Sequence, residues 1–198
     1  MVGTDVLWDR LDSVRYIALT FDDGPNPGTT PEILDVLAEY GIKAAFFVVG
    51  MNLEIAENRR VMRRAYDEGH VIGNHTYSHP ALAKLSDNEI REELRRTEDL
   101  IGECASGPRL FRPPFAALDT RISRIIQEEG FRMVMWNVDS LDWKFRSSEW
   151  VDFTMEQVLG REFSLILMHD ICPTAEHLSA LIDTIRALPG HLRFLRYR

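Results

Sequence analysis

The sequence predicts an α/β fold built on a parallel sheet, and two observations support this prediction. Apolar stretches of strand length alternate with amphipathic helical stretches, without an internal repeat, a low-complexity run or a linker. Such alternation is typical of parallel strands joined by right-handed crossovers, in a sheet that is either open or closed into a barrel. In addition, polar residues follow several of these strands, where both kinds of sheet place their sites.

The predicted strands are short and mostly apolar. Residues 43–49 are a near-continuous apolar run, which is typical of a strand covered on both faces. The seven expected strands cover residues 17–21, 43–49, 70–75, 109–112, 131–138, 164–168 and 192–197.

The helices between these strands are predicted from their ends. Ser86 and Glu89 form a capping-box pattern at the start of the longest helix, and Gly41 follows the first helix. Capping residues are also expected at the starts of three other helices, at Thr30, Asp119 and Thr174. The expected helices cover residues 30–40, 86–104, 119–129 and about 147–159, with one somewhere within 53–68 and a last one from 174 onward.

Length and composition fit one globular domain. A chain of 198 residues with 45% hydrophobic and 27% charged residues can bury a full core, so we expect residues 1–198 to form a single domain and a monomer. The formal charge of −8 argues against nucleic acid or an acidic membrane surface as the partner. A neutral or cationic substrate agrees better with this charge.

The chain shows no signal peptide and no membrane span. Residues 1–10 lack the basic region and apolar core of a leader, and no stretch is apolar for long enough to cross a bilayer. Cys104 and Cys172 are the only cysteines, so we expect two free thiols rather than a disulfide framework.

Asp22 and Asp23 are adjacent carboxylates that follow the first strand, directly before the break Gly24-Pro25. Such a pair needs a bound cation, a basic partner or a raised pKa on one member, because the two charges repel each other and lose hydration. The same residues are also good turn formers, so the motif alone does not separate a turn from a site. Polar residues at the ends of five strands favour the site: Asp22, Asp23, His75, Arg112, Asp139, Asp142 and His169.

His75 and His79 are candidate metal ligands. Imidazoles four residues apart can bind one ion, although such a pair is often structural, and Pro80 favours a turn over a helix at His79. Two histidines and one aspartate leave coordination positions open, as in catalytic metal sites. Non-haem iron oxygenases use the same ligand types, but they need neither a second adjacent aspartate nor a late histidine.

Three further positions could complete a site. Arg112, before two prolines, would keep Asp22 ionised, unless it is a surface arginine before a turn. Asp142-Trp143 offers an acid beside a flat apolar face. His169 follows the apolar run 165–168 and is therefore held rigidly, either as a site residue or as a core histidine.

These motifs resemble, in order, the five motifs of the polysaccharide deacetylase family of carbohydrate esterases. The resemblance extends from about residue 15 to 196 and rests on residues 20–25 (TFDDGP), 75–80 (HTYSHP), 112–114 (RPP), 139–143 (DSLDW) and 167–169 (LMH). It implies a distorted (β/α) barrel of about seven parallel strands and one divalent metal ion, most often zinc. It also implies removal of acetate from N-acetylglucosamine residues of chitin-like or peptidoglycan polymers, and hence a secreted or cell-envelope protein.

The resemblance implies a role for each residue of the metal centre. Asp23, His75 and His79 resemble the family's metal ligands. Asp22 resembles its general base, and Arg112 resembles the partner of that base.

The resemblance also implies roles for the acid and the substrate pocket. His169 resembles the general acid, and Asp142 resembles its partner. The backbone N–H of Phe115 would bind the oxyanion, while Trp143 and Leu167 would form the walls of the acetyl pocket.

Phe115 and Ala116 depart from the family, which often has tyrosine and then glycine there. This departure leaves open a metal-bound carbohydrate-binding protein with weak or no catalysis. A deacetylase that acts on acetyl esters is a separate alternative.

Overall fold

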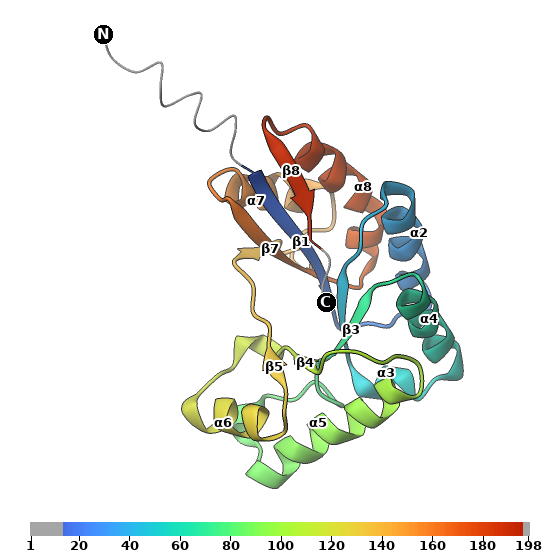
Figure 1. Ribbon diagram of the computed structural model, residues 1–198, viewed down its shortest axis with the longest axis vertical. Helices are drawn as coiled ribbons and strands as arrows, with labels where there is room; N and C mark the ends of the chain where they lie inside the picture. Colours follow the sequence, from blue (N-terminus) through green and yellow to red (C-terminus); the bar gives the residue numbers. More distant parts are fainter. Residues whose placement is uncertain (1–13, 196–198) are drawn as a thin grey trace.

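The structure is a computed structural model that describes residues 14–195. These residues form one sheet of eight parallel strands, in the order β5-β4-β3-β2-β1-β7-β6, with β8 also paired to β1. The strands are β1 (Val14–Asp22), β2 (Ala45–Val48), β3 (Val71–Asn74), β4 (Leu110–Phe111), β5 (Arg132–Met133), β6 (Val138–Asp139), β7 (Phe163–His169) and β8 (His191–Phe194). Figure 1 shows β7 and β8 toward one end of the molecule and β4 and β5 toward the other.

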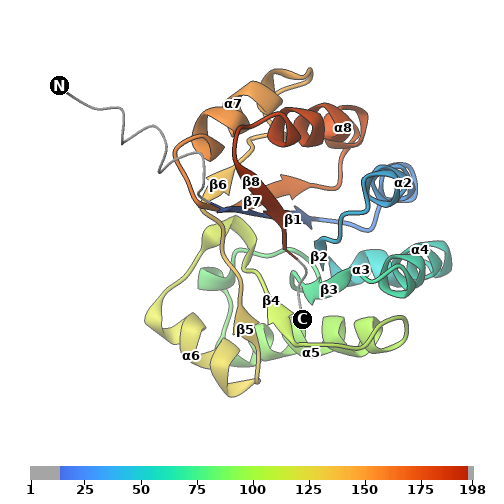
Figure 2. The same ribbon diagram turned by 45° about the horizontal axis from the view of Figure 1, so that its top comes forward.

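Helices cover the outside of this curled sheet, so the fold is a distorted (β/α) barrel, as the sequence predicts. Figure 2 shows the longer helices arranged around the strands. They are α2 (Thr30–Tyr40), α3 (Gly50–Leu53), α4 (Ala56–Asp67), α5 (Asp87–Gly102), α6 (Thr120–Glu128), α7 (Glu149–Val158) and α8 (Cys172–Arg186), with 3₁₀ turns η1 (Leu82–Lys84) and η2 (Pro114–Ala116). Within residues 14–195, none of the helices is long and apolar enough to cross a membrane.

The barrel is incomplete between β5 and β6, where the prediction of one strand over residues 131–138 is wrong. β5 pairs only with β4 and β6 only with β7 among the described residues, so the two are the ends of the sheet. The linking residues turn their carbonyls inward: Arg112 Nε donates to the Val134 oxygen at 3.0 Å, and Arg112 Nη2 to the Met135 oxygen at 3.4 Å. These carbonyls satisfy a buried cation instead of a neighbouring strand.

The helix ends confirm three predictions. The capping box at Ser86 and Glu89 is present, the Asp119 side chain accepts a hydrogen bond from the Ile122 N–H, and Gly41 ends α2 in the left-handed conformation.

Two predictions of helix caps are wrong, because the hydroxyls of these threonines donate to buried carboxylates instead. Thr30 donates to Asp170, and Thr174, which lies inside α8, donates to Asp142.

The helix expected within residues 53–68 is present as α4, and the short α3 that precedes it was not expected. The strand expected over 192–197 ends at Phe194 as β8, and positions 196–197 lie outside the described residues. Cys104 is buried and Cys172 exposed, and both are free thiols, as expected.

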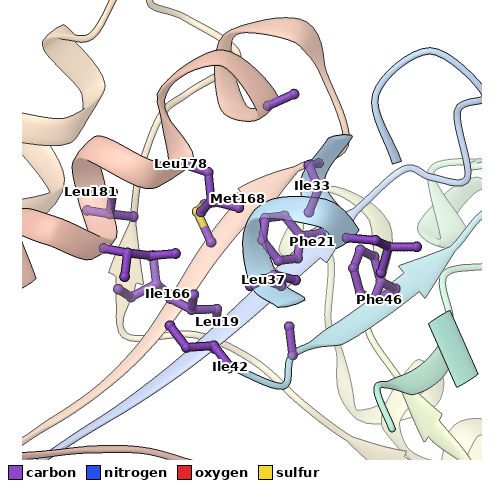
Figure 3. Packing of buried hydrophobic residues seen from close by; sticks show 14 of the residues in the cluster. Leu19, Phe21, Ile33, Leu37, Ile42, Phe46, Ile166, Met168, Leu178 and Leu181 are labelled. Carbon is purple, nitrogen blue, oxygen red and sulfur yellow. The ribbon is translucent and has the colours of Figure 1, made fainter. Parts of the chain in front are cut away.

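The largest apolar cluster fixes β1 between its neighbouring strands and the helices above them. Leu19 and Phe21 of β1 pack with residues of α2, β2, β7 and α8, and all of them are almost completely buried. Figure 3 shows this packing around Phe21, whose ring stacks on Phe46 with the centroids 5.1 Å apart. Each such side chain contributes about 1.5–3 kcal/mol by burial. The carboxyl end of β1, where Asp22 lies, is therefore rigidly placed.

Gly73 of β3 provides a test of this packing, because it leaves room for Phe47. A Cβ atom at Gly73 would lie 2.7 Å from both Cδ1 and Cε1 of that ring. The ring in turn stacks under the Arg112 guanidinium, with 4.2 Å from Cζ to its centroid. We expect Gly73→Ala to lower the free energy of unfolding by about 1–3 kcal/mol in urea denaturation.

Gly102→Ala is the matched control, since a Cβ atom at the end of α5 would meet nothing within 4 Å. We expect it to leave stability unchanged or raise it by up to about 1 kcal/mol, because alanine favours helices. Equal effects of the two substitutions would contradict this account of the β2–β3 packing.

Candidate functional site

A cleft of about 430 Å³ opens at the carboxyl ends of the strands. It brings together eight of the ten predicted site residues: Asp22, Asp23, His75, His79, Phe115, Trp143, Leu167 and His169. The other two, Arg112 and Asp142, are completely buried and bind cleft residues directly.

Asp23, His75 and His79 form the one cluster within residues 14–195 that could hold a metal ion, with their ligand atoms all within 4.8 Å of one another. Asp23 Oδ1 lies 3.4 Å from His75 Nε2 and 3.3 Å from His79 Nε2. Burial raises the pKa of Asp23, but the neighbouring histidines, His75 first, lower it more, so its pKa lies below the usual value. The carboxylate is therefore ionised near neutral pH.

The hydrogen bonding of this cluster fits a divalent cation. His75 Nδ1 lies 2.7 Å from the backbone oxygen of Arg112, which can only accept, so Nδ1 carries the proton and Nε2 presents a lone pair to Asp23. Burial lowers the pKa of His79, which favours its neutral, ligating form. Asp23 Oδ1 is itself buried and has no hydrogen-bond donor. Three lone pairs therefore converge on one point, as in a metal site.

Asp22 is held separately by a buried ion pair. Arg112 Nη1 donates to Asp22 Oδ1 at 2.7 Å and to the Thr20 hydroxyl at 2.8 Å. The guanidinium balances the charge of Asp22 without a metal ion. The second carboxylate oxygen, Oδ2, lies 3.7 Å from His75 Nε2 and is not bonded to Arg112.

His169 is paired with Asp142, and it lies at the end of β7 directly beside Asp22 of β1. Its Nδ1 lies 2.7 Å from Asp142 Oδ1, and its backbone N–H donates to Asp142 Oδ2 at 2.7 Å. Burial alone would lower the pKa of His169, but the Asp142 carboxylate, helped by the charges of Asp22 and Asp23, raises it above the usual value. The pairing with Asp142 thus favours the imidazolium form of His169 more than in an ordinary histidine.

Backbone strain is concentrated at this site. Six non-glycine residues among those described have left-handed φ angles, and each is a predicted site residue or directly next to one: Asp23, Thr76, His79, Phe115, Ala116 and Leu141. Such conformations typically cost about 1–3 kcal/mol each and persist where surrounding contacts enforce them. Ala116, with φ 53°, adopts the glycine-like turn despite its side chain.

Two aromatic side chains lie at the rim of the cleft. Phe115 is 70% exposed and Trp143 62% exposed. The Phe115 ring meets His79 edge-on, with 4.7 Å between centroids. Leu167 is buried in the cleft wall.

Sequence reasoning missed Trp136, which lines the cleft together with Asp139, a strand-end residue that the sequence does indicate. Asp170 is buried beside the turn after Asp23 and accepts a hydrogen bond from the Thr29 hydroxyl, and burial raises its pKa. The signal available for Asp170 was its adjacency to His169.

The protein is an α/β barrel whose cleft holds a candidate metal site of two histidines and one carboxylate. Beside this site lies a second aspartate, which is bound by a buried arginine. The chain belongs to the polysaccharide deacetylase family, whose model matches residues 10–134. The family model ends before Asp139, Asp142 and His169. These three residues are included in the similarity to a single relative, which extends over 89% of this chain.

Two relatives illustrate the similarity. The chain is 40% identical over 180 residues to a peptidoglycan-N-acetylglucosamine deacetylase of Bacillus cereus, covering 89% of this chain but 63% of the relative. It is 34% identical over 185 residues to a chitooligosaccharide deacetylase of Azorhizobium caulinodans, covering 91% of this chain and 85% of the relative. The chain spans only 35% of the length of the Listeria monocytogenes deacetylase PgdA.

Solved structures of the same fold include active and inactive proteins. The peptidoglycan deacetylase PdaC of Bacillus subtilis matches with a TM-score of 0.81 and 34% identity, over 93% of this chain and 89% of that one. A CE4 family pseudoenzyme of Bacillus anthracis matches with a TM-score of 0.79 and 27% identity, over 91% and 64%. Overall shape therefore does not decide whether this chain is catalytic.

Proposed function

We propose that this protein hydrolyses the acetamido group of N-acetylglucosamine residues in peptidoglycan or chitin-like saccharides and releases acetate. The proposal is supported above all by the division of two adjacent carboxylates: Asp23 faces two imidazoles, whereas Asp22 is paired with the buried Arg112. A secreted or cell-envelope location and a monomeric state are part of the proposal.

Asp23, His75 and His79 would hold one divalent ion, with zinc expected, which when bound lowers the pKa of a water ligand and polarises the acetyl carbonyl. Asp22 accepts the proton of the attacking water at Oδ2, the oxygen that Arg112 does not bind. Arg112 keeps Asp22 ionised and oriented. The Phe115 N–H would stabilise the oxyanion that develops on the carbonyl oxygen.

His169 supplies the proton for the departing amine. An amine is a poor leaving group until its nitrogen is protonated, and the pairing with Asp142 keeps the acid form of His169 populated. Trp143 and Leu167 would enclose the acetyl methyl group. After proton transfer, acetate and the free amino sugar are the products.

Three other functions compete with this proposal. Binding without catalysis is favoured by the likeness to a pseudoenzyme, but the Asp22–Arg112 and His169–Asp142 pairs supply a base and an acid. An iron oxygenase is disfavoured, because its two-histidine, one-carboxylate site belongs to β-rich double-sheet folds rather than to a parallel barrel. Hydrolysis of acetyl esters needs the same machinery except for the acid.

The direct test is acetate release from N-acetylglucosamine oligomers of several lengths, with metal content measured alongside. We expect chelation to abolish release and added zinc to restore it, because the ligand set leaves positions for water and substrate. Full activity of a demonstrably metal-free protein would end the metal hypothesis. Absence of acetate from every oligomer, with zinc bound, would favour the binding-only alternative.

Asp22→Asn and Asp23→Asn should separate the roles of the two carboxylates. We expect Asp22→Asn to retain zinc but lose about 10²–10⁴ in rate, as for loss of a general base. Asp23→Asn should weaken zinc binding itself. Asp139→Asn is the matched control for metal content, because Asp139 lines the cleft but does not belong to the cluster of candidate ligands. If Asp22→Asn and Asp23→Asn lost zinc equally, the assignment of Asp22 as base and Asp23 as metal ligand would be wrong.

His169→Ala should impair amide cleavage far more than cleavage of an aryl acetate. The phenolate of the ester departs without a proton, whereas the amine does not, so the amide rate should fall by about a further 10²–10⁴. Both reactions are measured on one purified variant with its zinc content confirmed. A parallel fall of the two rates would assign His169 a structural or substrate-binding role.

A further inference from the structure

Glu93 of α5 binds the chain segment that joins the two histidines. Its Oε2 accepts hydrogen bonds from the backbone N–H groups of Tyr77 and Ser78, each at 2.8 Å. Its Oε1 lies 2.8 Å from the Ser78 hydroxyl, which donates to it. One carboxylate thus satisfies three donors between His75 and His79.

These donor groups lie beyond the end of β3, so no neighbouring strand accepts their hydrogen bonds. The chain leaves β3 after Asn74 and reverses through Thr76 and His79, both with left-handed φ angles of 69° and 57°. A reversal of this kind turns the N–H groups of residues 77 and 78 away from any strand. The Tyr77 N–H is partly buried and needs an acceptor, whereas Ser78 is exposed, and Glu93 of α5 accepts from both.

The two histidines differ in how their rings are held. The His75 ring is fixed by its hydrogen bond to the Arg112 backbone oxygen and is almost completely buried. The His79 side chain is 28% exposed, and among the described residues its ring has no hydrogen bond. The His79 ring contacts the rings of Phe115 and His75, and the His79 backbone N–H donates to the Thr76 hydroxyl at 3.1 Å. The position of the ring therefore depends on the turn at residues 76–79, and Glu93 binds two backbone N–H groups of that turn.

We propose that Glu93 is a positioning residue that sets the metal affinity of the site through His79. This inference rests on the proposed metal site formed by Asp23, His75 and His79. Groups that orient metal ligands from outside the coordination sphere typically change metal affinity by about 10–100-fold when they are removed. Here the oriented part is the backbone next to the ligand.

The test is zinc affinity of the metal-free protein, measured by competition with a chromophoric chelator. We expect Glu93→Ala to bind zinc about 10–100-fold more weakly than the unsubstituted protein. Glu93→Gln should bind more tightly than Glu93→Ala, because its amide oxygen can still accept from the Tyr77 and Ser78 N–H groups. Glu92→Ala is the matched control: Glu92 precedes Glu93 in α5, carries the same charge and is exposed. It should leave the affinity unchanged.

Further readouts separate positioning from a general structural role. At saturating zinc, Glu93→Ala should regain most of its acetate release, since the ligands themselves are intact. The visible absorption of bound cobalt should differ between Glu93→Ala and the Glu92→Ala control, because one imidazole is less well fixed. If Glu93→Ala does not fold, Glu93→Asp provides the same test, because it keeps the charge but draws the carboxylate back by one methylene group.

The outcomes distinguish the inference from the proposed function. If the unsubstituted protein binds no zinc at this cluster, the proposed metal site fails. If it binds zinc and a folded Glu93→Ala or Glu93→Asp protein binds it within about twofold, far less than the 10–100-fold expected of an orienting group, only the role of Glu93 is overturned.

Discussion

The site depends on one completely buried guanidinium, that of Arg112. It pairs with Asp22, stacks on Phe47 and donates to the carbonyls of Val134 and Met135. A buried cation is stable only when its donors are satisfied, and removing one partner typically costs about 3–5 kcal/mol. The break between β5 and β6 supplies two of these acceptors. The distorted part of the barrel and the ion pair are therefore joined through Arg112.

Arg112 also explains how adjacent aspartates acquire different surroundings. Because the guanidinium balances Asp22, the carboxylate left to face the imidazoles is Asp23, which turns away from β1 with a φ of 72°. The backbone oxygen of Arg112 fixes the tautomer of His75. The backbone N–H of Arg112 donates to the Asn74 oxygen. One residue thus orients both the proposed base and a proposed metal ligand.

Patterns local in sequence predicted most of this arrangement, and contacts between distant residues account for what they missed. The alternation of strands and helices and the polar strand ends are visible within short windows. The break within residues 131–138 is not, because those residues favour a strand and the cation that interrupts it lies 22 positions away from Val134. Thr30 and Thr174 are good capping residues by type, yet buried carboxylates bind their hydroxyls. Nothing in the sequence distinguishes Glu93 from Glu92.

The central claim, that Arg112 leaves Asp23 rather than Asp22 to bind the metal, is tested most directly by anomalous diffraction from crystals of the zinc-loaded protein. The account predicts one strong zinc peak, ligated by Asp23, His75 and His79, with Asp22 still paired to Arg112. A zinc ion ligated by Asp22, or a strong peak at a different group of side chains, would contradict it.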